Sequence, residues 1–264
     1  MLSSMVVIMK SRALAIAILV LTAHRLLAAD APADTRSYEL RVYHVNDGKL
    51  ETLHTLLRDH AVKLFEKHGI TSIGYWTPIE KTDRKLYYLL AYPSREAREK
   101  AWASFRADPD WKSAIKASEK NGKVVAKVES TFLHTTDFSP AIQPNAAAEP
   151  RVFELRTYTA TPGNLGKLQS RFRRHTVRLF NRHGMTNFGY WLHDNDQAAA
   201  ADTLVYLLAH KSKAECEASF KAFSEDPQWV EVRKESEKEA GGPLTVSGGV
   251  KSVLLAPIDY SPTK

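Results

Sequence analysis

The feature that most constrains the fold of this sequence is an internal duplication. Tyr38–Trp76 and Phe153–Trp191 align without a gap, and 18 of the 39 aligned columns are identical. The similarity resumes in three shorter stretches: 86–92 with 204–210, 107–111 with 225–229, and 137–140 with 259–262. Between the copies lies AIQPNAAAEPR, rich in proline and alanine and without periodicity. The chain of 264 residues is therefore predicted to hold two domains of one fold, at 37–140 and 152–262, joined by a linker at 141–151.

Each copy alternates between strand-type and helix-type patterns. Apolar and polar residues alternate in Ser37–Val45, which predicts a strand. From Leu50 to His68 apolar residues recur at helical spacing, and Gly69 is placed to end that helix. The remaining elements are predicted as strands at 71–77, 85–92 and 124–134, with helices that begin after Ser94 and Asp108. The order β-α-β-β-α-β is that of a ferredoxin-like unit, so we expect an α+β protein of two such units in tandem.

Four motifs together resemble the NIPSNAP family: YELRVY at 38–43, KHG at 67–69, GYW at 74–76 and DPDW at 108–111. The resemblance covers both copies. It implies the dimeric α+β barrel fold, in which two ferredoxin-like units pair their sheets around a shared cavity, here within one chain. That barrel group also contains cofactor-free monooxygenases, dye-decolourising peroxidases and haem-degrading enzymes. The resemblance therefore implies a fold and leaves the reaction open.

The first 29 residues have the layout of a secretory signal. Lys10 and Arg12 precede an apolar run, Ala13–Ala23, and the small residues Ala28 and Ala29 follow it. The run is shorter than the roughly 20 residues that span a bilayer. We predict a signal peptide at 1–29, cleaved after Ala29 with Ala31 or Ala33 as alternative cleavage sites, and a spacer at 30–36. The protein would then be exported to a periplasmic or extracellular location with no stable membrane span; an uncleaved anchor is the alternative.

Charge and cysteine content exclude several classes of function. Without residues 1–29 the chain has 34 basic and 30 acidic side chains, too even a balance to predict nucleic-acid binding. The single cysteine, Cys216, excludes an internal disulfide framework and CxxC metal sites. Phosphate loops, nucleophile elbows and HExxH motifs are absent from the sequence. We therefore predict no metal and no cofactor, with haem kept as an alternative because of the barrel group.

The candidate site comes from the two faces of the first strand. If the helices cover Tyr38, Leu40 and Val42, the opposite face points between the two sheets. That opposite face carries Glu39, Arg41 and Tyr43 in the first copy, and Glu154, Arg156 and Tyr158 in the second. One interpretation is a pair of structural ion pairs. The other is a ligand pocket in which the arginines bind an anion and the tyrosines donate hydrogen bonds.

Aromatic residues and histidines complete the list of candidates. In Tyr75–Trp76 and Tyr190–Trp191 one ring must face the helices and the other the barrel, as core packing or as a wall for a flat apolar ligand. The histidines of the long helices are interpreted as structural, because positions eight apart lie about 12 Å apart along a helix and cannot share a metal ion. They are His60 and His68, repeated as His175 and His183.

Three functions remain compatible with these patterns. The first is a binding module for a small polar-apolar ligand or a protein partner. The second is an enzyme, a monooxygenase-like oxidoreductase that is cofactor-free or haem-dependent, although the sequence indicates no catalytic residue. The third is a purely structural homo-oligomer, which a barrel filled with side chains would favour.

Overall fold

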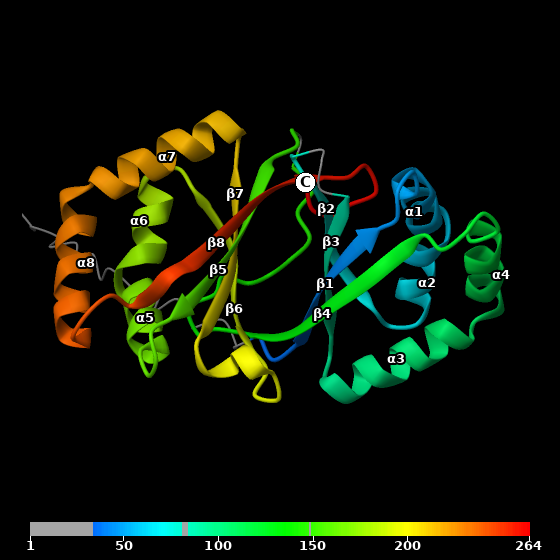
Figure 1. Cartoon of the computed structure of the whole chain (residues 1–264), viewed down its shortest axis with the longest axis horizontal. Helices are drawn as coiled ribbons and strands as arrows, with labels where there is room; N and C mark the ends of the chain where they lie inside the picture. The colour runs from blue at the N-terminus through cyan, green and yellow to red at the C-terminus, as the bar shows by residue number, and fades with distance from the viewer. Residues whose placement is uncertain (1–33, 81–83, 148) are drawn as a thin grey trace, which may run out of the picture. The chain divides into compact units, whose positions relative to one another are not determined.

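The computed structural model describes residues 34–80, 84–147 and 149–264. The predicted signal peptide lies outside the described residues. Eight antiparallel strands form a closed barrel in the order β1-β3-β2-β8-β5-β7-β6-β4 (Figure 1). The strands are β1 Ser37–Val45, β2 Thr71–Pro78, β3 Lys85–Tyr92, β4 Val125–Thr135, β5 Val152–Ala160, β6 Thr186–His193, β7 Thr203–His210 and β8 Thr245–Pro257.

The barrel closes where the last strand of each copy leaves its own sheet. Strand β4 pairs with β1 over most of its length, and its end, Leu133–Thr135, pairs with β6 of the other copy. Strand β8 pairs with β5, and its end, Leu255–Pro257, pairs with β2. The predicted meeting of the two sheets within one chain is therefore confirmed.

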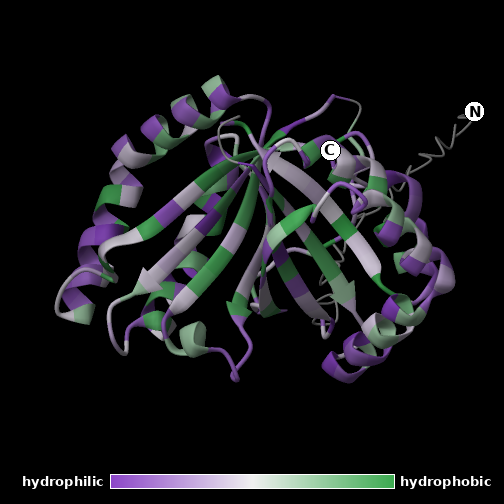
Figure 2. Ribbon diagram, turned by 45° about the vertical axis from the view of Figure 1, so that its right-hand side comes forward, coloured by the Kyte–Doolittle hydropathy of each residue, from purple (hydrophilic) through white to green (hydrophobic). Residues whose placement is uncertain are grey.

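Helices cover the outer face of each sheet (Figure 1). In the first copy they are α1 Leu50–Leu56, the π-helical turn η1 Leu57–Ala61, α2 Val62–Lys67, α3 Arg95–Ala107 and α4 Pro109–Ser118. In the second they are α5 Leu165–Arg171, the π-helical turn η2 Phe172–Thr176, α6 Val177–Arg182, the 3₁₀ turn η3 Ala198–Ala201, α7 Lys213–Glu225 and α8 Pro227–Ala240. Hydrophilic positions predominate along the helices, whereas hydrophobic positions recur along the strands (Figure 2). Within the described residues, no helix combines the length and apolar character needed to cross a membrane.

Two of the predicted helix starts are visible in atomic detail. The Ser94 hydroxyl accepts a hydrogen bond from the Ala97 amide, and the Asp108 carboxylate accepts one from the Asp110 amide. Both side chains satisfy amides that a first helical turn leaves without partners. The capping residues therefore begin α3 and α4 where the sequence predicted.

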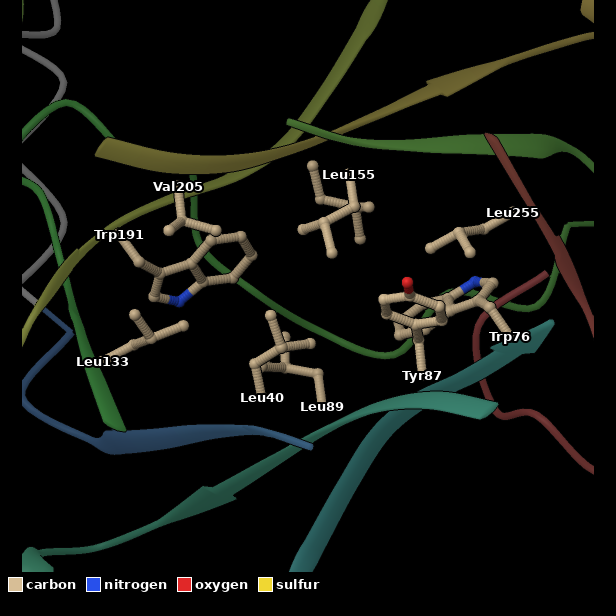
Figure 3. A pocket seen from close by; sticks show the side chains of 10 residues that line it. Leu40, Trp76, Tyr87, Leu89, Leu133, Leu155, Trp191, Val205 and Leu255 are labelled. Atoms are coloured by element: carbon tan, nitrogen blue, oxygen red, sulfur yellow. The ribbon is translucent and has the colours of Figure 1, made fainter. Parts of the chain in front are cut away.

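Three hydrophobic layers hold the molecule together. Two of them lie between a sheet and its helices, and the third lies between the two sheets. The inter-sheet layer contains Trp76 and Trp191, each almost fully buried, together with Tyr38 and Phe153. Figure 3 shows the two indoles and the leucines beside them. Their side chains leave a cavity of about 20 Å³, room for about one water molecule. The barrel interior is therefore filled.

Candidate functional site

The structure corrects the predicted orientation of the first strand. Tyr38 and Leu40 point into the inter-sheet layer, whereas Tyr43 packs in the layer beneath the helices. Glu39 and Arg41 share that helix-facing side, where Glu39 contacts Arg98 of α3. The prediction that this triplet lies between the sheets was wrong. The prediction assumed that the more apolar face of the strand packs against the helices. Both faces of each sheet are buried, one beneath the helices and one inside the barrel, so hydropathy does not tell the two faces apart.

In the second copy, too, the triplet lies on the helix side of the sheet and not between the sheets. Tyr158 packs in the layer between the second sheet and its helices. Arg156 lies 4.5 Å from the ring centroid of Phe220 in α7, so it too is on the helix side. The two triplets therefore occupy separate sites on opposite sides of the barrel. They do not converge on one cavity.

Glu39 is the centre of a buried ionic cluster in the first copy. Its carboxylate has no solvent exposure and accepts a hydrogen bond from Arg41 at 2.5 Å and two from Arg98 at 2.8 and 2.9 Å. The hydroxyls of Tyr92 and Ser130 donate to it as well. Burial alone would raise the pKa of Glu39, but these bonds and the two positive charges outweigh it and lower the pKa to about 2. A second, more exposed carboxylate, Glu99, accepts a hydrogen bond from Arg98 at 2.9 Å, so two acidic groups balance the two guanidinium groups.

Arg41 links this cluster to a cavity between the first sheet and its helices. The cavity has a volume of about 270 Å³. Its walls are mainly aromatic and aliphatic, and Arg41, Tyr43, Arg106 and Glu119 supply the polar groups. The side chain of Arg41 is 11% exposed, stacks 4.4 Å from the Trp102 ring centroid and donates to the Tyr88 hydroxyl at 2.7 Å. An apolar chamber with a few fixed polar groups is the usual form of a small-molecule site.

The corresponding positions of the second copy carry larger side chains. Leu56 and Leu57, which line the first cavity, align with Arg171 and Phe172. Arg171 is 7% exposed, and its guanidinium lies 5.2 Å from the ring centroid of Trp229, the counterpart of Trp111 in the first cavity. The two copies therefore share a fold but differ in the space beneath their helices. Sequence reasoning missed this cavity, although the change in side-chain size between aligned positions was a signal for it.

The aromatic pairs divide as expected between the two sides of their strands. Tyr75 and Tyr190 lie in the helix-side layers, and Trp76 and Trp191 in the inter-sheet layer. The tryptophans fill the barrel, so this part of the structure supports the core-packing interpretation. A role for any of these four residues in ligand binding stays a prediction.

Two of the predicted structural histidines bind helix caps. His68 lies 2.8 Å from the Asp108 carboxylate, and His183 lies 2.6 Å from that of Asp226. Each joins the end of one helix to the start of another in the same copy. His60 is exposed and His175 is partly exposed. His60 and His68 therefore do not take part in one common site among the described residues.

The sequence and the fold now define a class: an α+β barrel formed within one chain by two ferredoxin-like repeats. The sequence profile of the NIPSNAP family matches residues 38–140 and 153–262. The protein belongs to the NIPSNAP family. It is 27% identical over 135 residues to the protein named "Protein NipSnap homolog" of Dictyostelium discoideum, which covers 50% of this chain and 53% of that relative. The chain thus spans about half the length of the relative that it matches.

Three solved structures share the whole barrel. A protein of Fusobacterium nucleatum named "Putative monooxygenase" has a TM-score of 0.59 and 11% identity, covering 85% of this chain and 93% of that one. A protein of the same name from Lactobacillus acidophilus has a TM-score of 0.53 and 12% identity over 87% and 95% of the two chains. An "anthrone oxidase-like protein" has a TM-score of 0.54 and 11% identity over 88% and 95%. At such identities the similarity shows the fold alone.

Proposed function

We propose that this protein binds a small, flat, largely apolar molecule in the cavity between the first sheet and its helices. The observation that carries the proposal is the 270 Å³ chamber whose mainly apolar walls include Arg41 and Tyr43. An aromatic ligand would pack on Trp102 and Trp111. A carboxylate or phenolate oxygen of that ligand would face the guanidinium group of Arg41, which lines the chamber.

The filled barrel interior supports this choice of site. Trp76 and Trp191 occupy the space between the sheets, so that space offers no room for a ligand without a rearrangement. The filled barrel also suits a purely structural protein, but such a protein has no need of the chamber beneath the helices. The proposal therefore assigns binding to the first copy and a structural role to the inter-sheet layer.

The test uses the second copy as a source of compatible residues. Naphthalene-2-carboxylate is the probe, titrated by calorimetry and by quenching of tryptophan fluorescence. We expect Leu57→Phe, which introduces the residue found at the aligned position 172, to weaken binding at least tenfold with an unchanged circular dichroism spectrum. The matched control Phe172→Leu changes the other copy and should leave affinity unchanged. Equal binding by Leu57→Phe and the unaltered protein would overturn the assignment.

A second candidate function is oxidation of the bound molecule. The structural neighbours named as monooxygenases or as anthrone oxidase-like favour it, as does an Arg41–Tyr43 pair placed to stabilise a phenolate oxygen in an apolar chamber. Anthrone is a suitable substrate: with one O₂ it gives anthraquinone and one water. Oxygen consumption with stoichiometric quinone would support an enzyme, and naphthoate binding without turnover would support a binding module. A visible Soret absorption of protein purified from its own host would identify the haem-dependent form.

The location is a separate part of the proposal. Lys10, Arg12 and the apolar run that follows support export with cleavage after Ala29. N-terminal sequencing of the protein from its own host should find a chain that begins near Asp30. An intact Met1 on the soluble protein would contradict export by a cleaved signal.

A further inference from the structure

The second copy lacks one of the two arginines that bind the buried glutamate of the first. In the alignment Arg98 corresponds to Cys216, and Tyr92 corresponds to His210. Glu154 keeps two partners of the same kind as Glu39, because its Oε1 atom accepts from Arg156 at 2.5 Å and from Ser252 at 2.7 Å. Its other oxygen, Oε2, faces the two exchanged residues. Where the first copy has a guanidinium group, the second therefore has a thiol and an imidazole.

These side chains bring three potential ligand atoms together. Glu154 Oε2 lies 3.5 Å from His210 Nε2 and 3.8 Å from Cys216 Sγ, and one ligand atom from each residue falls within 4.8 Å of the others. All three residues are buried, with 3%, 2% and 5% exposure for Glu154, His210 and Cys216. In a tetrahedral zinc site, oxygen, nitrogen and sulfur ligands are separated by roughly 3.3–3.6 Å. The two separations from Glu154 Oε2 are near that range, and the ligand atoms of His210 and Cys216 lie within 4.8 Å of each other, so binding of an ion would draw these two side chains closer.

His210 provides an independent observation. Among the described residues its Nδ1 atom has no hydrogen-bond partner, and its Nε2 atom has only the long 3.5 Å contact to Glu154 Oε2, although the side chain is only 1% exposed. A buried polar group without a partner is costly, and native structures rarely leave one. Coordination through one ring nitrogen would satisfy this imidazole, and the Oε2 atom that it approaches is the carboxylate oxygen free of Arg156 and Ser252.

We infer that Glu154, His210 and Cys216 form a binding site for a divalent transition metal, with Zn²⁺ the best match to one carboxylate, one imidazole and one thiolate. On binding, the S–H bond of Cys216 breaks, the thiolate coordinates the ion and the proton leaves to solvent. The ion and the thiolate together carry one positive charge, which equals the charge of the Arg98 guanidinium in the first copy. Three protein ligands leave the fourth position of a tetrahedral ion to water.

A reactive cysteine is the competing explanation of the same residues. A nucleophilic thiol needs a path for its substrate, and Cys216 lies in the first turn of α7 with 5% exposure. A metal ion needs only the three ligand atoms and a transient opening of the helix. The burial of all three side chains therefore favours a metal site over a nucleophilic thiol.

The test is a cobalt titration of the full chain, without an affinity tag, after dialysis against a chelator. We expect one equivalent of Co²⁺ to give a near-ultraviolet thiolate-to-cobalt charge-transfer band, and Zn²⁺ to remove it. X-ray absorption of the zinc-loaded protein should show one sulfur ligand with nitrogen and oxygen ligands. A folded, chelator-treated protein that gives no such band would overturn the inference.

Two variants localise the metal. Cys216→Ser should abolish the charge-transfer band and lower zinc affinity at least tenfold. Cys216→Arg introduces the residue that the first copy tolerates at the aligned position, so it should fold, lose zinc binding and show no rise in Tm when zinc is added. If Cys216→Arg retains the zinc-dependent rise in Tm of the unaltered protein, the ion binds elsewhere and the inference fails.

Discussion

The indole of Trp76 lies across the Cα atom of Gly74, two residues earlier on the same face of β2. A Cβ atom added at position 74 would lie 2.2 Å from two carbons of that ring. Gly189 and Trp191 repeat the arrangement in the second copy, with a closest approach of 2.5 Å. The glycine of each GYW motif therefore makes room for the tryptophan that fills the barrel.

Gly74→Ala should consequently force the Trp76 ring to shift within a packed layer. We expect the free energy of unfolding to fall by about 1–3 kcal/mol, as for other overpacked cores. Gly166→Ala is the matched control, because Gly166 is exposed in α5 and a Cβ atom there meets nothing within 4 Å. Alanine should stabilise that helix by up to about 1 kcal/mol. Urea denaturation of both variants measures whether the free energy of unfolding falls for Gly74→Ala and rises for Gly166→Ala.

Substitution of Arg98 should show how much the buried ionic cluster contributes to the free energy of unfolding. We expect Arg98→Ala to cost about 3 kcal/mol, the lower end for a broken buried ion pair, because Arg41 still balances Glu39. Arg58→Ala breaks an ion pair with Asp259 whose members are 37% and 63% exposed, and it should destabilise the protein much less, because water screens the two charges. Equal effects of the two substitutions in urea denaturation would contradict the assignment of Glu39 to a desolvated cluster.

The lowered pKa of Glu39 predicts acid sensitivity. The carboxylate has a pKa of about 2 when folded and an ordinary value of 4.5, so its contribution is complete above pH 4.5 and is lost as the pH falls towards 2. The loss is about 3 kcal/mol. Glu39→Gln should be less stable at pH 7, because two arginines lose their counter-charge. The variant should also lose less stability than the unaltered protein between pH 5 and pH 2.5, measured by thermal denaturation.

Asp108 joins two functions that substitution can separate. Its carboxylate caps α4 and also binds Lys67 at 2.7 Å and His68 at 2.8 Å. Asp108→Ser keeps a capping oxygen and loses both ionic contacts, whereas Asp108→Ala loses all of them. We expect Tm to fall for both variants, and further for alanine. Identical Tm values would mean that the cap contributes nothing measurable.

The elements of the fold were predictable because local patterns determine them. The alternation in Ser37–Val45 and the caps Ser94 and Asp108 lead to the strands and helices observed. Which face of a strand lies beneath the helices was not predictable in the same way. With one face beneath helices and the other inside a barrel, Leu40 and Glu39 are both removed from water, and hydropathy alone does not say which side is which.

The sites depend on relationships between distant residues. Leu56 and Leu57 line the chamber of the first copy where the second has the larger Arg171 and Phe172, and the helices above it pack at a distance that no local pattern sets. His210 and Cys216 lie on β7 and α7, more than 50 residues beyond Glu154, so no motif spacing connects them. Comparison of the aligned copies, position by position, was the signal that could have found both.

The crossing of β4 and β8 into the opposite sheets has a consequence for symmetry. In a barrel assembled from two identical chains, every substitution is present twice, so an open chamber or a new ligand cluster arises on both sides together. Here the two halves of the barrel are two different segments of one polypeptide, so a residue can differ between them. Leu57 stands on one side and Phe172 on the other, and Arg98 of the first copy aligns with Cys216 of the second. The two copies therefore keep one barrel architecture while the side chains beneath the helices differ from copy to copy.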